Sequence, residues 1–187
     1  MSLSLMKQDV LETMLLHEKP SKATEIAKET NEKFRPVMMH LLGLVRMGYV
    51  CSPEKGLYII TEKGKEALGL PEINKEKAIA ILVYAPHEDA FHFYADIGNP
   101  TNLHAHNLRD FANKLEKVDI CSIEFHTKRG DFEAWFNGLG DVELAKKVAL
   151  LKQKNVVGED LRKQLREIVE QRYIVLAKLA GQPLNTE

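Results

Sequence analysis

The sequence predicts an α+β protein with two domains, residues 1–72 and residues 73–187. Helical apolar spacing with a small strand pair marks the first part, and alternating apolar residues followed by long helices mark the second. A polar segment with a proline, GLPEINKEK at 69–77, separates the two parts. The 187 residues are 44% hydrophobic and 28% charged, with a formal net charge of −1, which is typical of a folded globular chain.

Apolar spacing in the first domain predicts three helices between residues 5 and 48, the third with Val37, Leu41 and Leu44 on one face. Two short apolar runs, YVC and LYII, flank SPEKG at 52–56 and predict a hairpin, and a short helix follows at 61–68. A two-stranded hairpin is only marginally stable alone in water, so we expect it to cover one side of the three-helix core.

The segments EIAKET, VMMHLLGLVRMGYV and LYIITEKGKEAL occur in that order. They resemble the second helix, third helix and wing of the winged helix-turn-helix in MarR-, ArsR- and PadR-like prokaryotic regulators. The resemblance covers residues 1–72 and implies binding to double-stranded DNA, with the third helix in the major groove and the wing at the backbone. The candidate DNA-binding residues are Lys33, Arg35, His40, Arg46 and Lys55.

Charge and apolar content leave two functions open. Residues 1–72 hold ten basic and ten acidic residues, so DNA binding requires the basic groups to gather on one face. Met38 and Met39 stand at outward positions of the third helix, where methionine cannot donate a hydrogen bond to a base but can form an adaptable protein-binding surface. The first function is a DNA-binding transcriptional regulator with a sensing or dimerisation domain. The alternative is a docking module that does not bind DNA, attached to a small-molecule-binding or catalytic α+β domain.

The second domain is predicted to be a small α+β unit with about three strands that ends in a long helix. The expected strands are 79–84, 90–95 and 119–126, and the expected helices are 105–115, 131–137, 142–152 and 159–179.

A candidate ligand-binding site lies in SIEFHTKRGDFEAWF at 122–136. A strand that ends at His126 and a helix that starts near Asp131 would gather polar groups at one corner. Backbone N–H groups at a helix start, together with an arginine, favour a small anionic effector. The alternative is structural: Asp131 caps the helix, and Arg129 pairs with Asp131 or Glu133. The candidate residues are His126, Arg129, Asp131 and Trp135.

The same segment, with NLRDFANKL before it and GDVELAKKV after it, resembles a prokaryotic domain of unknown function that carries an FHxxRGDFExW pattern. The resemblance covers about residues 90–172 and implies no known activity. The sequence contains no G-x-S-x-G, phosphate-binding glycine loop or H-E-x-x-H motif, so no catalytic residue and no cofactor are predicted.

The remaining histidines and cysteines predict neither a metal site nor a disulfide. His104 and His106 are expected to open a helix, where side chains two residues apart diverge. Cys51 and Cys121 stand in apolar, strand-like contexts and are expected to be buried free thiols. No apolar run reaches the roughly 20 residues of a membrane helix, and the N-terminus lacks a signal-peptide pattern, so a cytoplasmic protein without membrane contact is predicted.

The long C-terminal helix carries apolar residues at spacings of four and three, which is the pattern of a coiled-coil interface. This stripe consists of Leu161, Leu165, Ile168, Arg172, Val175 and Leu179. It is short, so packing on the helix's own domain is the alternative. We expect a homodimer, because winged-helix regulators read two half-sites through a two-fold axis. In that dimer Arg172 would pair with Glu167 or Glu170 of the other chain.

Overall fold

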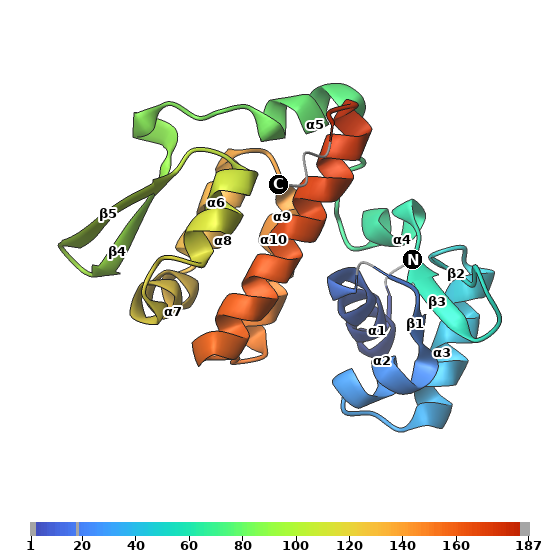
Figure 1. The fold of residues 1–187 in the computed structure, drawn as a ribbon. Helices are drawn as coiled ribbons and strands as arrows, with labels where there is room; N and C mark the ends of the chain where they lie inside the picture. The colour runs from blue at the N-terminus through green and yellow to red at the C-terminus, as the bar shows by residue number, and fades with distance from the viewer. Residues whose placement is uncertain (1–2, 18, 184–187) are drawn as a thin grey trace. The chain divides into compact units, whose positions relative to one another are not determined.

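The structure, a computed structural model, describes residues 3–17 and 19–183, and the chain divides into two compact units, Met1–Glu72 and Ile73–Glu187 (Figure 1). Helices predominate in both units, each described part also has a small sheet, and the C-terminal helix is long, so the α+β class is confirmed. Among the described residues, no helix combines the length and apolar character needed to cross a membrane.

The N-terminal unit contains the predicted helices and hairpin, together with a short strand that the sequence did not reveal. Strand β3 lies in the centre of its sheet, in the order β1-β3-β2, and both pairings are antiparallel. The elements are α1 (Leu5–Leu16), β1 (Ser21–Lys22), α2 (Ala23–Glu29), α3 (Phe34–Arg46), β2 (Val50–Cys51), β3 (Leu57–Ile60) and α4 (Glu62–Ala67).

The core of this unit forms where α1, α2 and α3 meet the sheet. Val37, Leu41 and Leu44 of α3 are fully buried, as their spacing predicts, and they pack in one cluster with apolar residues of α1, α2, β2 and β3. The sheet therefore covers the three helices, which supplies the support that an isolated hairpin lacks.

Helix α4 packs closely against the residues that lead into β2. Thr61 caps α4 by accepting a hydrogen bond from the Gly64 N–H at 3.1 Å, and its hydroxyl donates to the Gly48 carbonyl at 2.7 Å. A Cβ atom on Gly64 would lie 2.2 Å from the carbonyl oxygen of Tyr49, so only glycine fits this position without movement of the backbone.

The C-terminal unit places one antiparallel hairpin beside a group of helices (Figure 1). Helix α10 contacts α5, α6, α7 and α9, and α7 contacts β4. The elements are α5 (Lys75–Leu82), the 3₁₀ turn η1 (His87–Asp89), β4 (Phe91–Asp96), β5 (Asn99–Ala105), α6 (Leu108–Leu115), α7 (Ile120–Arg129), α8 (Asp131–Gly138), α9 (Val142–Gln153) and α10 (Gly158–Ala180).

Two predicted strands of this unit are helices. Residues 79–84 fall largely in α5 and residues 119–126 in α7, because a short apolar run has no periodicity that separates a strand from a buried helix. The apparent alternation in α7 was misleading: Ile123 is buried, whereas Cys121 is exposed. The predicted burial of the cysteines was wrong for Cys51 also, although both are free thiols.

The strand that was missed is β5. The predicted helix 105–115 begins only at Leu108. The residues up to Ala105 belong to β5, which pairs antiparallel with β4. His104 consequently lies on a strand, opposite His92, and not at the start of a helix.

The apolar stripe of α10 faces the interior of its own unit. Leu161, Leu165, Ile168 and Arg172 are all buried, and only Val175 and Leu179 remain 40% exposed. The stripe was therefore wrongly assigned to a dimer interface, since four of the six side chains that would form it are already buried within their own unit.

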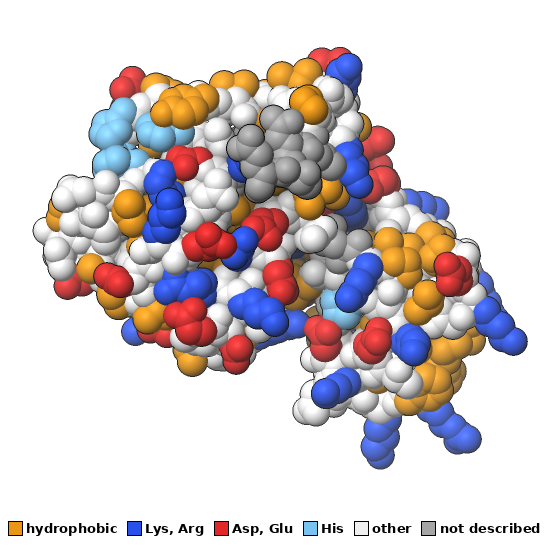
Figure 2. All heavy atoms as spheres, viewed as in Figure 1, with side chains coloured by type: hydrophobic (Ala, Val, Ile, Leu, Met, Phe, Trp, Pro, Cys, Tyr) orange, Lys and Arg blue, Asp and Glu red, His pale blue; other side chains and the backbone are white. Residues whose placement is uncertain are grey.

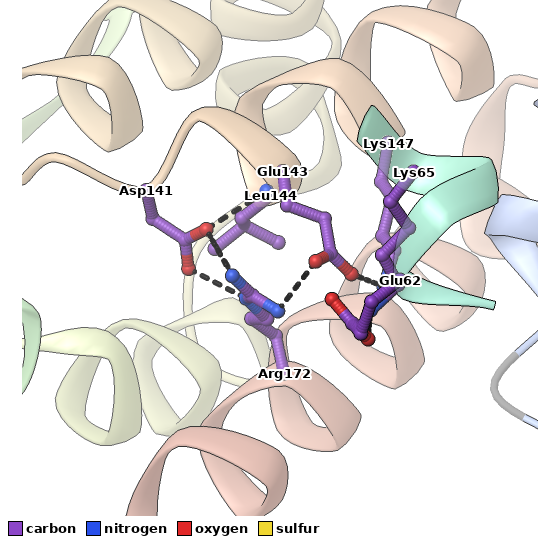
Figure 3. A network of polar contacts seen from close by, with 7 residues as sticks. All are labelled: Glu62, Lys65, Asp141, Glu143, Leu144, Lys147 and Arg172. Atoms are coloured by element: carbon purple, nitrogen blue, oxygen red, sulfur yellow. Dashed lines mark hydrogen bonds and ion pairs between the residues drawn. The ribbon is translucent and has the colours of Figure 1, made fainter. Parts of the chain in front are cut away.

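Arg172 is the centre of a buried ionic network (Figure 3). Its guanidinium group donates to Asp141 through Nε at 2.8 Å and Nη2 at 2.8 Å, and its Nη1 lies 2.9 Å from Glu143. Glu143 also pairs with Lys147 at 2.8 Å, and Asp141 caps α9 by accepting from the Leu144 N–H. These four charged side chains are at most 5% exposed and carry two positive and two negative charges, so the network is neutral.

We expect Arg172→Met to lower the free energy of unfolding of the C-terminal unit by about 3–5 kcal/mol, because it leaves buried carboxylates without their partner. Chemical denaturation followed by the fluorescence of the single tryptophan, Trp135, measures this loss within the same unit. The matched control is Arg166→Met, which removes half-exposed pairs with Glu116 and Glu170 and should cost less than about 1 kcal/mol. Equal losses in the two variants would contradict the role given to the network.

We expect Gly64→Ala to destabilise the N-terminal unit by about 1–3 kcal/mol, because the new methyl group meets backbone and not a movable side chain. Thermal unfolding followed by far-UV circular dichroism tests this. Gly138→Ala is the control, since a Cβ atom there meets nothing within 4 Å and alanine favours the helix. A Gly64→Ala protein as stable as the parent would refute the tight packing of α4.

Candidate functional site

The outward face of α3 carries four side chains in a row, each about one helical turn from the next. Arg35, Met39, Leu42 and Arg46 follow the spacing i, i+4, i+7 and i+11, and all are exposed. The row thus has an arginine at each end and apolar side chains between them. We call these four residues the α3 row.

The other candidate DNA-binding residues lie around this row. Lys33 directly precedes α3 and is exposed, Lys55 is exposed in the turn between β2 and β3, and His40 is half-buried. Within residues 3–17 and 19–183, the structure gives no ion pair to Lys33, Lys55 or either arginine of the α3 row. These cations are therefore available to an external anion.

A hollow of about 480 Å³ lies between α3 and the hairpin. Phe34 and Met38 of α3 line one side, Lys55 and Tyr58 line another, and Lys22 stands at the start of α2. Phe34 is 49% exposed although it is a large apolar residue. Figure 2 shows lysine and arginine side chains projecting beside apolar ones on this part of the N-terminal unit. The hollow therefore joins the turn between β2 and β3 to the start of α3.

The second candidate site is a helix-to-helix corner and not the predicted strand-to-helix corner. Helix α7 ends at Gly130, whose φ of 81° is the left-handed conformation that glycine adopts readily, and α8 begins at Asp131. The Asp131 side chain does not cap α8. It turns back towards α7 instead, where it contacts His126 and Arg129.

His126 joins this corner to the hairpin. Its Nε2 accepts a hydrogen bond from the backbone N–H of Tyr94 on β4 at 2.9 Å, so Nδ1 carries the proton and donates to Asp131 at 2.7 Å. Burial lowers the pKa of His126 below its ordinary 6.5, and the hydrogen bond and charge of Asp131 oppose this only in part. His126 is therefore a neutral structural link with both ring nitrogens engaged.

Arg129 closes one side of a shallow pocket of about 330 Å³. Its Nε lies 3.0 Å from Asp131, and its guanidinium carbon lies 5.1 Å from the centre of the Phe125 ring. The pocket lining is Phe91, His92, Tyr94, Asp96, Ile97, Gly98, Phe125, His126, Arg129 and Asp131. Carboxylates already stand beside the arginine and in the first turn of α8, which reduces the attraction for an anion. The anionic effector stays a prediction.

The remaining residues of the FHxxRGDFExW pattern connect elements. Phe132 is fully buried in the core, and Trp135 donates from Nε1 to the carbonyl of Asp89 in η1 at 2.9 Å. Trp135 lies outside the pocket lining. Glu133 lies 4.0 Å from Lys152 of α9, and burial raises the pKa of its carboxyl. The pattern thus ties α7 and α8 to η1, β4 and α9.

Fold and site together define a chain with a small helical unit bearing a three-stranded sheet, followed by a helix-rich α+β unit in which a histidine of α7 bonds to the hairpin. The model of DUF5752, described as a family of unknown function, matches residues 72–170, which is more than half of the chain. The chain therefore belongs to this family. No curated protein and no solved structure gives a significant match.

Sequence reasoning missed residues of the hairpin because β5 was not expected. His87 and His92 received no role, and the predicted corner did not include Tyr94, which supplies the N–H bound by His126. A signal was present: FHF at 91–93 and LHA at 103–105 both place a histidine between apolar residues, which indicates two paired strands.

We expect the pKa of His126 to lie below 6.5 in an NMR titration, because protonation of Nε2 would abolish the bond from the Tyr94 N–H. A depressed folded-state pKa means that the unfolded chain binds the proton more readily, so stability is full above pH 6.5 and falls as the pH decreases through that region. Between pH 7.5 and 5.5, His126→Gln should lose less free energy of unfolding than the parent. A pKa above 6.5 would show that the Asp131 charge outweighs burial.

Proposed function

We propose that the N-terminal unit is a winged helix-turn-helix that binds double-stranded DNA, and that the protein is a cytoplasmic transcriptional regulator. The helix order, the β1-β3-β2 sheet and the position of α3 before the hairpin support this proposal. The observation that carries it is the α3 row, whose Arg35 and Arg46 are exposed and have no ion pair among the described residues.

The spacing of the two arginines suits the width of a DNA groove. Eleven residues separate Arg35 from Arg46 along α3, which corresponds to about 16 Å at 1.5 Å per residue. The major groove is about 12 Å wide, so the two guanidinium groups can reach phosphates on its opposite sides. Met39 and Leu42 would then face the bases, where they can contact thymine methyl groups but cannot donate hydrogen bonds.

This arrangement favours affinity over sequence selectivity. Phosphate contacts give affinity without reading the sequence, and the middle of the α3 row offers no hydrogen-bond donor. Lys55 at the wing tip and Lys33 before α3 would add further phosphate contacts. We therefore propose a protein that binds many duplex sequences, with a modest preference for sites rich in thymine.

The C-terminal unit would supply sensing or dimerisation. The pocket beside His126 and Arg129 is the candidate for a small effector. A homodimer that reads two half-sites remains a prediction, and it would have to form through a surface other than the buried stripe of α10.

A docking function is the second candidate. Phe34, Met39 and Leu42 are exposed apolar residues on one helix, and the unit has equal numbers of basic and acidic residues. Apolar anchors surrounded by polar residues are typical of protein-binding surfaces. In this function the wing and α3 would bind a protein partner. The two arginines of the α3 row would lie at the rim of that interface.

We expect the protein to bind a fluorescent duplex of random sequence with an affinity that falls steeply as salt rises, because counterion release dominates phosphate binding. Charge reversal at two cations, Arg35→Glu with Lys55→Glu, should abolish binding. The matched control reverses two exposed lysines of the C-terminal unit, Lys117→Glu with Lys163→Glu, which gives the same net charge. Anisotropy titrations at several salt concentrations measure both.

Two results would overturn the DNA proposal. One is a parent protein that does not bind duplex DNA even at low salt. The other is an equal loss in the two double variants, which would attribute binding to net charge and not to the α3 face. In either case the exposed apolar side chains of α3 would still need a function.

A further inference from the structure

Four of the chain's seven histidines gather at one edge of the C-terminal unit, where Figure 2 shows them as a pale blue group. They are His87 in η1, His92 on β4, His104 on β5 and His106 just after β5. None of them has a part in the DNA-binding proposal, which concerns the other unit. The first three face one another, and we call them the histidine cluster.

The hairpin register creates this cluster. His92 and His104 are direct partners across β4 and β5, and their ring centres are 4.5 Å apart. η1 brings His87 to ring-centre distances of 4.8 Å from His92 and 4.7 Å from His104. One ring nitrogen from each residue lies within 4.8 Å of the other two. Three segments of the chain thus aim imidazoles at one point.

The spacing is close to that of a metal site. Imidazole nitrogens bind Zn²⁺ at about 2.0–2.1 Å, which places two tetrahedral ligands about 3.3 Å apart. The cluster exceeds this separation by at most about 1.5 Å, a change that side-chain rotation supplies without movement of the strands. The nearby cation Lys114 is paired with Asp110 at 2.8 Å.

The hydrogen bonds of the rings also suit metal binding. His92 donates from Nε2 to the carbonyl oxygen of His87 at 2.8 Å, which leaves Nδ1 as a ligand atom. Metal-binding histidines usually donate their other N–H in this way, and the bond fixes the ring. In His104, Nδ1 is buried and has no partner among the described residues. A buried nitrogen without a partner is unfavourable, and coordination or a water molecule on the ion would relieve that cost.

His106 is not part of the set, because its Nδ1 contacts the Ala85 carbonyl at 3.0 Å and its ring stacks on Tyr84.

We propose that His87, His92 and His104 bind one divalent transition-metal ion of the Zn²⁺ class. An all-imidazole set suits zinc, nickel or copper, whereas magnesium and calcium require oxygen ligands. His87 is exposed, so the fourth position opens to solvent and holds water or a ligand. The ion would fasten η1 to the hairpin, whose strands are anchored to the helices through buried side chains such as Phe91 and Phe93.

Calorimetric titration of tag-free protein with Zn²⁺ tests the proposal, together with elemental analysis after dialysis. The parent should retain one ion per chain. His87→Ala and His104→Ala should each weaken binding by more than the roughly 10–100-fold that loss of an outer-shell partner costs. His40→Ala, in the N-terminal unit, is the control and should bind as the parent does.

Co²⁺ provides a readout of geometry, since its visible absorption is intense only in four-coordinate sites. The parent should give this spectrum and His87→Ala should not. His87 is exposed, so its removal should leave the circular dichroism unchanged even if His104→Ala fails to fold. The proposal is overturned if the folded His87→Ala protein binds Zn²⁺ as tightly as the parent, or if the parent retains no ion.

Discussion

The C-terminal unit depends on the bond between Arg172 and Asp141. A guanidinium group buried in the middle of the longest described helix is unfavourable unless it is fully paired, and the two oxygens of Asp141 match its planar fork. Asp141 also caps α9, so a single carboxylate fixes both where α9 starts and how α10 lies against it. Glu143 and Lys147 extend the pairing along α9. The packing of α10 leaves its apolar stripe unavailable for a partner, which explains why a pattern typical of a coiled coil belongs to a core.

The hairpin depends on a different kind of link. β4 contacts α7 through His126, whose neutral ring joins the backbone of Tyr94 to Asp131, and Trp135 holds the preceding turn at Asp89. His126, Asp131 and Trp135, which the sequence assigned to a ligand site, therefore help to position the hairpin and the turn before it. Two surfaces of this unit remain open to ligands: the pocket that Arg129 helps to line and the histidine cluster on the same hairpin.

How well each helix or strand was predicted depended on how clearly its own residues showed a helical or alternating pattern. In the N-terminal unit, the spacing of Val37, Leu41 and Leu44 and the turn SPEKG identified α3 and the hairpin directly. In the C-terminal unit, α7 was mistaken for a strand because three apolar residues alternate over one and a half turns, and only tertiary burial of Ile123 and His126 decides the matter. β5 begins with Asn99 and Pro100 and has few apolar residues, so the LHA segment at 103–105 was its only local signal. The histidine cluster is non-local, and it became visible only once that strand was paired.

The way the hairpin is attached has a consequence for how the unit moves. Its turn at Ile97 and Gly98 is exposed, and its register is irregular between His92 and Asp96, so its far end has little to hold it. Amide hydrogens near that turn should exchange with solvent through local opening, at a free energy well below that of global unfolding, while the amides of α9 and α10 exchange only when the whole unit unfolds. The Tyr94 N–H, which is bound by the imidazole of His126, marks the boundary between these two regimes.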